Sequence, residues 1–139
     1  MRRLLALLSA LLFLSFLAAP AAVAGEPHFI NNAFSITRAD DTLSVSAKEA
    51  GLGDEAQIHV LLSADAACIN PGGNHPKAAN KESFSTAADV PVQNGKAVYT
   101  LFLTATFQPS CSPPMTVQFS NVVLRDVTNN LTKTFPGTF

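Results

Sequence analysis

The sequence predicts an all-β protein: an antiparallel, immunoglobulin-like sandwich of about seven strands with one disulfide. Beyond residue 24 the chain consists of short runs in which apolar and polar residues alternate, the period of a strand with one buried face. Clusters of Gly, Pro, Asn and Asp separate these runs, and none of the runs has a helical pattern. A small barrel is the alternative architecture.

Residues 1–24 have the three parts of a secretory signal peptide. Arg2 and Arg3 form a cationic start, residues 4–19 are almost wholly apolar, and Ala-Val-Ala at 22–24 is a small-residue cleavage motif. We therefore expect cleavage near Gly25, a secreted extracellular protein and a single domain of residues 25–139. The alternative is an uncleaved segment that anchors the chain in a membrane.

The net charge of the mature chain argues against some classes of binding partner. The leader carries two arginines and no acidic residue, so its removal moves the net charge from −1 to −3. Nucleic acids and anionic membranes attract clustered Lys and Arg, which this chain lacks. We expect no nucleic-acid partner, no membrane contact after cleavage, and a monomer.

The first three expected strands cover residues 33–37, 42–48 and 56–63. Alternate apolar residues give each strand one buried face: Phe34 and Ile36, then Leu43, Val45 and Ala47, then Ile58, Val60 and Leu62. Asp40-Asp41 suits the turn between the first two strands. A long Pro- and Gly-rich loop is expected from Ala64 to about Lys81.

Two hairpins are expected in the second half of the chain. Asn94-Gly95 favours a two-residue turn that would pair residues 82–93 with residues 96–107, and Pro91 favours an edge position for the first arm. Tyr99, Leu101, Leu103 and Ala105 would share one face, and Val98 and Phe102 on the other face suggest a strand covered on both sides.

The last hairpin would pair residues 115–125 with residues 131–135. Val117, Phe119 and Val123 supply its apolar positions. The run Val122-Val123-Leu124 breaks the alternation, which is typical of a β-bulge.

The two cysteines, Cys68 and Cys111, permit one intramolecular disulfide. An oxidising compartment favours this bond over a metal site. It would join two Pro-rich loops at one pole of the sandwich and stabilise the fold by about 4 kcal/mol on the chain-entropy model. Two free thiols, or a dimer linked through one of them, are the alternatives.

The loop after Cys68 has a pattern of residues that resembles one found in a group of other proteins. Its Cys-x-Asn-x-Gly-Gly-Asn-x-Pro pattern, with the Asn94-Gly95 hairpin and the later loop cysteine, resembles a group of uncharacterised small secreted proteins of high-GC bacteria and fungi. The resemblance covers roughly residues 42–135. It implies export and a β-sandwich, and it implies no activity.

The same loop is the candidate binding site. Long loops in compact domains frequently bind ligands, and Asn amides can bond to sugar hydroxyls while Gly allows close approach. The candidate residues are Asn70, Gly72, Gly73, Asn74, His75, Asn80 and Lys81. The competing interpretation is that these asparagines bond only to the backbone of their own loop.

Nothing in the sequence predicts catalysis, a cofactor or a metal ion. His28, His59 and His75 are scattered, and no spacing of acids matches a calcium loop. No nucleophile elbow, P-loop or zinc motif occurs. Asn130-Leu131-Thr132 fits an N-glycosylation site, which only a eukaryotic host would use.

These observations favour a non-catalytic extracellular module that binds a glycan, a cell-wall polymer or another protein through the 70–81 loop. The first alternative is a small hydrolase whose acids or His75 meet at the loop pole. The second is a structural protein that self-assembles through the edge strand near Val90–Gln93, an arrangement that Pro91 opposes.

Overall fold

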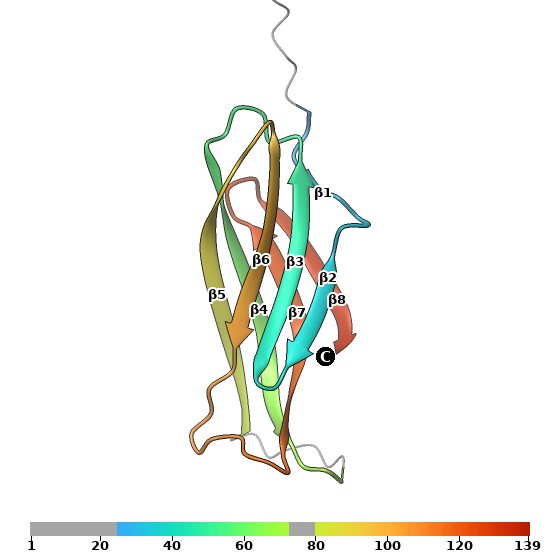
Figure 1. Cartoon of the computed structure of the whole chain (residues 1–139), viewed down its shortest axis with the longest axis vertical. Helices are drawn as coiled ribbons and strands as arrows, with labels where there is room; N and C mark the ends of the chain where they lie inside the picture. Colours follow the sequence, from blue (N-terminus) through green and yellow to red (C-terminus); the bar gives the residue numbers. More distant parts are fainter. Residues whose placement is uncertain (1–24, 73–79) are drawn as a thin grey trace, which may run out of the picture.

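The chain folds into two packed antiparallel β-sheets (Figure 1). The computed structural model describes residues 25–72 and 80–139, so the expected signal peptide lies outside the described residues. Within these two ranges, no helix is long and apolar enough to cross a membrane. The all-β class predicted from the alternating runs is confirmed.

The first sheet, sheet A, is built around β3 (Thr42–Ala50). One side of β3 pairs with β6 (Lys96–Thr104) along nine residues. The other side pairs with β1 (His28–Phe29) and then with β2 (Ser35–Ala39), so that edge is made of two short strands. The expected Asp40-Asp41 turn joins β2 to β3, with Asp40 at a φ of 51°.

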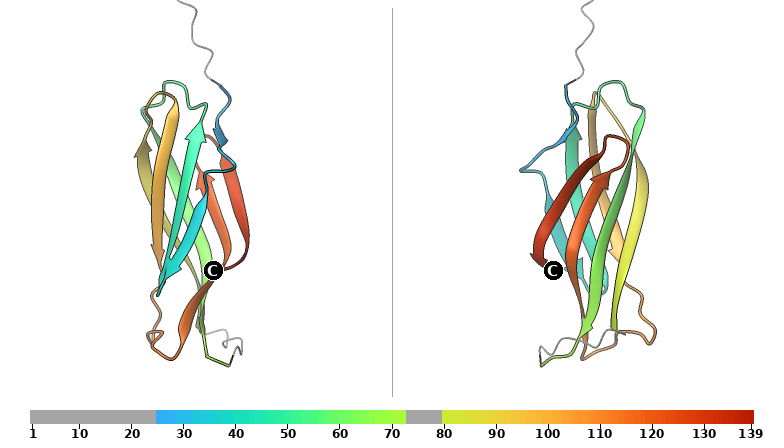
Figure 2. Two further views of the ribbon diagram at one scale, coloured as in Figure 1. Left: turned by 45° about the vertical axis from the view of Figure 1, so that its right-hand side comes forward. Right: turned by 180° about the vertical axis from the view of Figure 1, so that it is seen from behind.

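The second sheet, sheet B, contains β4 (Gln57–Ile69), β5 (Lys81–Pro91), β7 (Thr116–Asp126) and β8 (Leu131–Thr138) in the order β5-β4-β7-β8. The chain passes from sheet A to sheet B after β3, returns for β6 and crosses again for β7 and β8, as in immunoglobulin-like sandwiches. Figure 2 shows the two sheets facing each other. The short strand β1 brings the number of strands in the described residues to eight, against the seven expected.

The inner faces of the sheets supply the core in the alternation that the sequence predicts. Leu43, Val45 and Ala47 of β3 pack against Ile58, Val60 and Leu62 of β4, and all six are nearly or fully buried. Tyr99, Leu101, Leu103 and Ala105 complete the buried side of sheet A. Burial of such apolar area is the main favourable term in folding.

Residues Ser120 and Asn121 of β7 explain the broken alternation in that strand. The register between β4 and β7 shifts here, and Asn121 has a φ of 50°. The extra residue turns Val122 and Leu124 inward, on the same side as Phe119. The expected bulge is confirmed one residue earlier than the apolar run, and Val123 is not one of the fully buried residues.

Strand β4 is longer than the sequence pattern indicates. The expectation that a loop starts at Ala64 is wrong: β4 continues to Ile69, with Ala64, Ala66 and Cys68 on its buried face. These residues keep the period of two, but their small side chains give a weak apolar signal. The connection between β4 and β5 is therefore confined to residues 70–80.

The turn at Asn94-Gly95 forms as predicted, but the hairpin does not. Both residues have positive φ, and Gln93 and Lys96 exchange two backbone hydrogen bonds of 2.8 and 3.0 Å. Beyond this bridge β5 pairs with β4 in sheet B and β6 pairs with β3 in sheet A. The turn carries the chain between sheets, and β5 lies at an edge, as Pro91 predicts.

The expectation that β6 is covered on both faces is also wrong. Val98 and Phe102 are 67% and 63% exposed on the outer face of sheet A. Their outward neighbours are hydroxyl side chains: Thr42 bonds to Thr104 at 2.9 Å, and Ser46 to Thr100 at 2.8 Å.

Candidate binding surface

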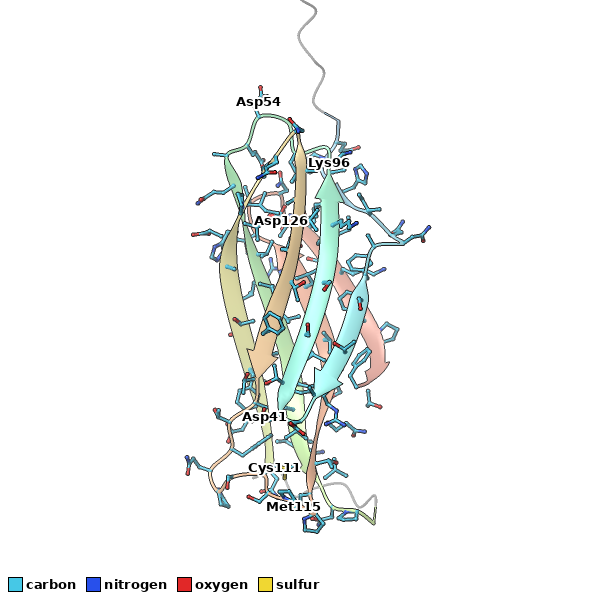
Figure 3. All side chains as sticks on the ribbon, in the orientation of Figure 1. Asp41, Asp54, Lys96, Cys111, Met115 and Asp126 are labelled. Carbon is cyan, nitrogen blue, oxygen red and sulfur yellow. A yellow bond between two sulfur atoms is a disulfide. The ribbon has the colours of Figure 1, made fainter. Side chains whose placement is uncertain are left out.

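The disulfide fixes one pole of the sandwich. Cys68 lies near the end of β4 and Cys111 in the connection between β6 and β7, with a Cα–Cα distance of 5.7 Å. Cys68 is 4% exposed, so the bond closes over the end of the core. Figure 3 shows Cys111 at this pole, beside Met115 and close to Asp41. The predicted disulfide is confirmed, but it joins the end of strand β4 to a loop rather than two loops, because β4 extends past Cys68.

The candidate loop begins and ends at this pole. Asn70 and Gly72 are exposed directly after β4, and Asn80 is half-buried just before β5. Lys81 is the first residue of β5 and pairs with Ala67. Gly73, Asn74 and His75 lie outside the described residues, so the structure brings together only the two ends of the predicted site.

A groove of about 480 Å³ lies on the outer face of sheet B beside these loop ends. It runs across strands β5, β4, β7 and β8, and its lining combines polar side chains with apolar surface. Of the predicted site residues that the structure describes, Lys81 is the one that lines it. The other lining residues are Asp65, Ala66, Ala67, Ile69, Glu82, Ser83, Gln118, Ser120, Asn121 and Thr138.

The carboxylate of Asp65 is held in place within this groove. Asp65 sits directly opposite Ser83 on β5 and Ser120 on β7. The Ser83 hydroxyl donates to Oδ1 of Asp65 at 2.6 Å, and the Asn121 amide nitrogen donates to Oδ2 at 2.8 Å. Each carboxylate oxygen is thus oriented by a neighbouring strand, Oδ1 by β5 and Oδ2 by β7.

The bulge in β7 supplies the second of these hydrogen bonds. Asn121 adopts a φ of 50°, a left-handed conformation that Asn tolerates better than most residues. The extra residue moves its side chain out of the regular strand register and toward Asp65. Bulges frequently re-aim a side chain in this way at functional surfaces.

These contacts favour the ionised form of Asp65. The hydrogen bond from Asn121, followed by that from Ser83, lowers the pKa of Asp65 below its usual range, so the side chain is ionised at neutral pH. A carboxylate has about four acceptor positions, and the two protein donors leave the others open to a ligand. A carboxyl group with a lowered pKa is poorly suited to donate a proton as a general acid.

A second hollow, of about 470 Å³, lies on the other side of the disulfide. Arg38, Asp40 and Asp41 contribute its polar side, and Pro113 and Pro114 its apolar side. Arg38 donates to the backbone oxygen of Asp40 at 2.8 Å. The Asp41 carboxylate accepts one hydrogen bond, from the Thr42 hydroxyl at 3.2 Å, against the two that Asp65 accepts. The groove on sheet B is therefore the better organised of the two.

The groove was missed from the sequence because four strands and one bulge assemble it. Asp65 falls where the sequence pattern indicates a loop, and Ser83, Gln118 and Asn121 carry no local motif. The available signal was the period of two in residues 57–69, which places Asp65 on the outer face.

The other polar residues singled out from the sequence lie elsewhere. His59 is exposed and bonds across the sheet to Asp89 at 2.7 Å, and His28 bonds to the backbone oxygen of Glu26 at 2.8 Å. Asn130 is exposed in the turn between β7 and β8. In residues 25–72 and 80–139, no group of three His, Cys, Asp or Glu side chains is arranged to hold a metal ion.

Two acidic residues are fully buried, which the sequence reading missed. Glu49 of β3 and Asp126 of β7 come from opposite sheets and are both 0% exposed. Tyr99 donates a hydrogen bond to Oε1 of Glu49, and the Asn129 side chain donates to Oδ2 of Asp126 at 2.7 Å. These acids lie inside the sandwich rather than in a groove, so we expect them to affect the stability of the fold and not the binding of a ligand.

The chain was compared with protein-family models, curated proteins and solved structures, and none of them matches it.

Proposed function

We propose that the chain is a secreted, non-catalytic module that binds a hydroxyl-rich extracellular glycan in the groove on sheet B. The observation that carries the proposal is the fixed carboxylate of Asp65, held by Ser83 and Asn121 with acceptor positions still open. An oriented carboxylate beside amide and hydroxyl groups matches the donors and acceptors of sugar hydroxyls.

The surroundings of Asp65 extend this match. Gln118 and Thr138 add neutral donors and acceptors, and Lys81 and Glu82 add one charge of each sign. The groove is partly open to solvent and places polar groups beside apolar surface, which suits a ligand that keeps part of its hydration. Binding on a rigid sheet also needs little ordering of the protein, which reduces the entropic cost of association.

The disulfide and the first 24 residues support the extracellular part of the proposal. Disulfides persist in oxidising compartments, and the cationic, apolar and small-residue segments of residues 1–24 fit an export signal. The expected product is a secreted chain that starts near Gly25. Mass spectrometry of protein recovered from the medium of cells expressing the full chain tests this start.

The test of binding uses that secreted protein on an array of glucose, mannose and N-acetylglucosamine polymers. The strongest signal is then titrated by calorimetry with the wild type and with Asp65→Asn, which keeps the shape but removes the charge. We expect Asp65→Asn to weaken binding roughly tenfold, the loss of one charge-assisted hydrogen bond.

Asp89→Asn is the matched control. Asp89 lies on the outer face of the same sheet, bonded to His59 and away from the groove. It makes the same chemical change and is expected to leave the affinity unchanged. An array without any signal, or equal losses in the two variants, would contradict glycan binding in this groove.

A further inference from the structure

The four edges of the two sheets differ in how they resist pairing with another strand. The β5 edge carries Pro91, which has no N–H, and the β8 edge carries Pro136 and a register shift toward β7. The third edge is split between β1 and β2, which are two and five residues long. Prolines, bulges and short strands are the usual protections of an edge.

The β6 edge has none of these protections. Its nine residues pair with β3 without a register shift, and they include no proline and no glycine. Lys96, at its first position, is its one charged residue. Among the described strands, β6 has β3 as its one ladder partner. On its other side Lys96 bonds to Gln93, and the edge is open from Val98 onward.

The backbone groups on this open side can be identified. Ala105 donates to the backbone oxygen of Asp41 at 2.9 Å, directly after the last ladder pair of β3 and β6. Hydrogen bonds to one neighbour alternate along an antiparallel strand. Leu101 and Leu103 therefore bond toward β3, while Val98, Thr100 and Phe102 direct their N–H and C=O groups toward the open edge.

The same alternate residues carry the exposed apolar side chains. Val98 and Phe102 are 67% and 63% exposed, two positions either side of Thr100. If two copies of β6 pair antiparallel about Thr100, Val98 of each copy faces Phe102 of the other. Pairs of an aromatic and a β-branched residue across strands stabilise a sheet.

Charge favours the same arrangement. Lys96 begins β6, and Asp41 lies beside its other end, as Figure 3 shows. In an antiparallel pair, Lys96 of one copy falls at the end where the second copy carries Thr104 and Asp41. No like charges face each other along the ladder.

We propose that the protein forms a twofold-symmetric dimer in which β6 of one copy pairs antiparallel with β6 of a second copy, centred on Thr100. Sheet A becomes a continuous sheet across both copies. The grooves on the two copies of sheet B remain open, so the dimer presents two binding sites. This partner differs from the monomer expected from the sequence, and it uses a different edge from the one near Val90–Gln93.

The test is sedimentation of the secreted protein from about 1 µM to about 1 mM, a range suited to a small interface. We expect a concentration-dependent shift from monomer to dimer. Val98→Lys removes both apolar pairs of the dimer and is expected to weaken association roughly tenfold. Val127→Lys, a similar change at a 48% exposed valine outside β6, is the control and is expected to dimerise normally.

A second substitution tests the register. Adding Phe102→Glu to Val98→Lys places Glu opposite Lys in both pairs and is expected to restore the dimer. Adding Phe102→Lys instead places Lys opposite Lys and is expected to abolish it. A wild type that stays monomeric throughout the range overturns the proposal, as does a Lys/Glu variant that associates no better than Val98→Lys.

Discussion

Tyr99 donates a hydrogen bond to one carboxyl oxygen of Glu49 inside the sandwich, while the other oxygen, Oε2, has no partner among the described residues. Both side chains belong to sheet A and are directed toward sheet B, where Asp126 is also fully buried. An ionised carboxylate with an unpartnered buried oxygen is costly. Glu49 therefore favours its protonated form.

The first prediction is that stability falls as the pH rises from about 4.5 to about 7. Burial raises the pKa of Glu49 to about 7, the hydrogen bond from Tyr99 lowers it in part, and the charge of Asp126 raises it further. The native state thus holds its proton more tightly than the unfolded chain. The contribution is complete below the usual carboxyl pKa of 4.5 and is lost progressively as the pH rises to about 7, roughly 3 kcal/mol in all.

Urea unfolding at pH values between 5 and 9 measures this slope. Glu49→Gln, which cannot ionise, is expected to flatten the curve and to be more stable than the wild type at the alkaline end. Glu82→Gln on the exposed surface is the control. A wild-type stability that rises between pH 6 and 8 would contradict the assignment.

The second prediction concerns the disulfide. Replacing both Cys68 and Cys111 by Ala opens a loop of 43 residues in sequence separation and is expected to lower the free energy of unfolding by about 4 kcal/mol on the chain-entropy model. Reduction of the wild type is expected to have a similar effect, because the chain has no other cysteine. Equal unfolding midpoints for the oxidised and reduced protein would oppose this account.

The third prediction compares two phenylalanines on opposite sides of the sheets. Phe119 is fully buried between them, and its replacement by Ala is expected to cost about 3–5 kcal/mol. Phe102 is 63% exposed, and Phe102→Ala is expected to cost less than about 1 kcal/mol. Thermal unfolding of dilute protein measures both. Similar losses would mean that the inward and outward faces are assigned incorrectly.

The fourth prediction isolates the hydrogen bond from Asn121 to Asp65. Asn121→Gly removes the amide but retains a residue that tolerates the φ of 50° at this position. We expect the pKa of Asp65 to rise toward its usual range, because its largest lowering contact is lost. Carboxyl-carbon NMR titration follows this group directly, and an unchanged midpoint would exclude the contact in solution.

Local patterns predicted much of the fold because the physics behind them is local. The alternation at Leu43, Val45 and Ala47 reports one buried face, and Asn94-Gly95 reports a tight turn. The same period of two extends to Glu49. It would have predicted the burial of this side chain if a carboxyl group had been considered for the core. The two cysteines left one possible intramolecular pairing.

The remaining features depend on contacts between distant segments. A turn such as Asn94-Gly95 does not determine whether its arms pair in one sheet or separate into two. The groove depends on Asp65 meeting Ser83 and Asn121, which come from three strands and are aligned partly by a bulge. No spacing of residues along the sequence predicts such a site.

The measurement that tests the central proposal most directly is an NMR titration of the secreted protein with the oligosaccharide that binds best on the array. We predict that the amide signals of Asp65, Ser83 and Asn121 shift together and saturate at the calorimetric affinity. Shifts confined to Arg38 and Asp41, on the other side of the disulfide, or no shift with any saccharide, would contradict the assignment of this groove.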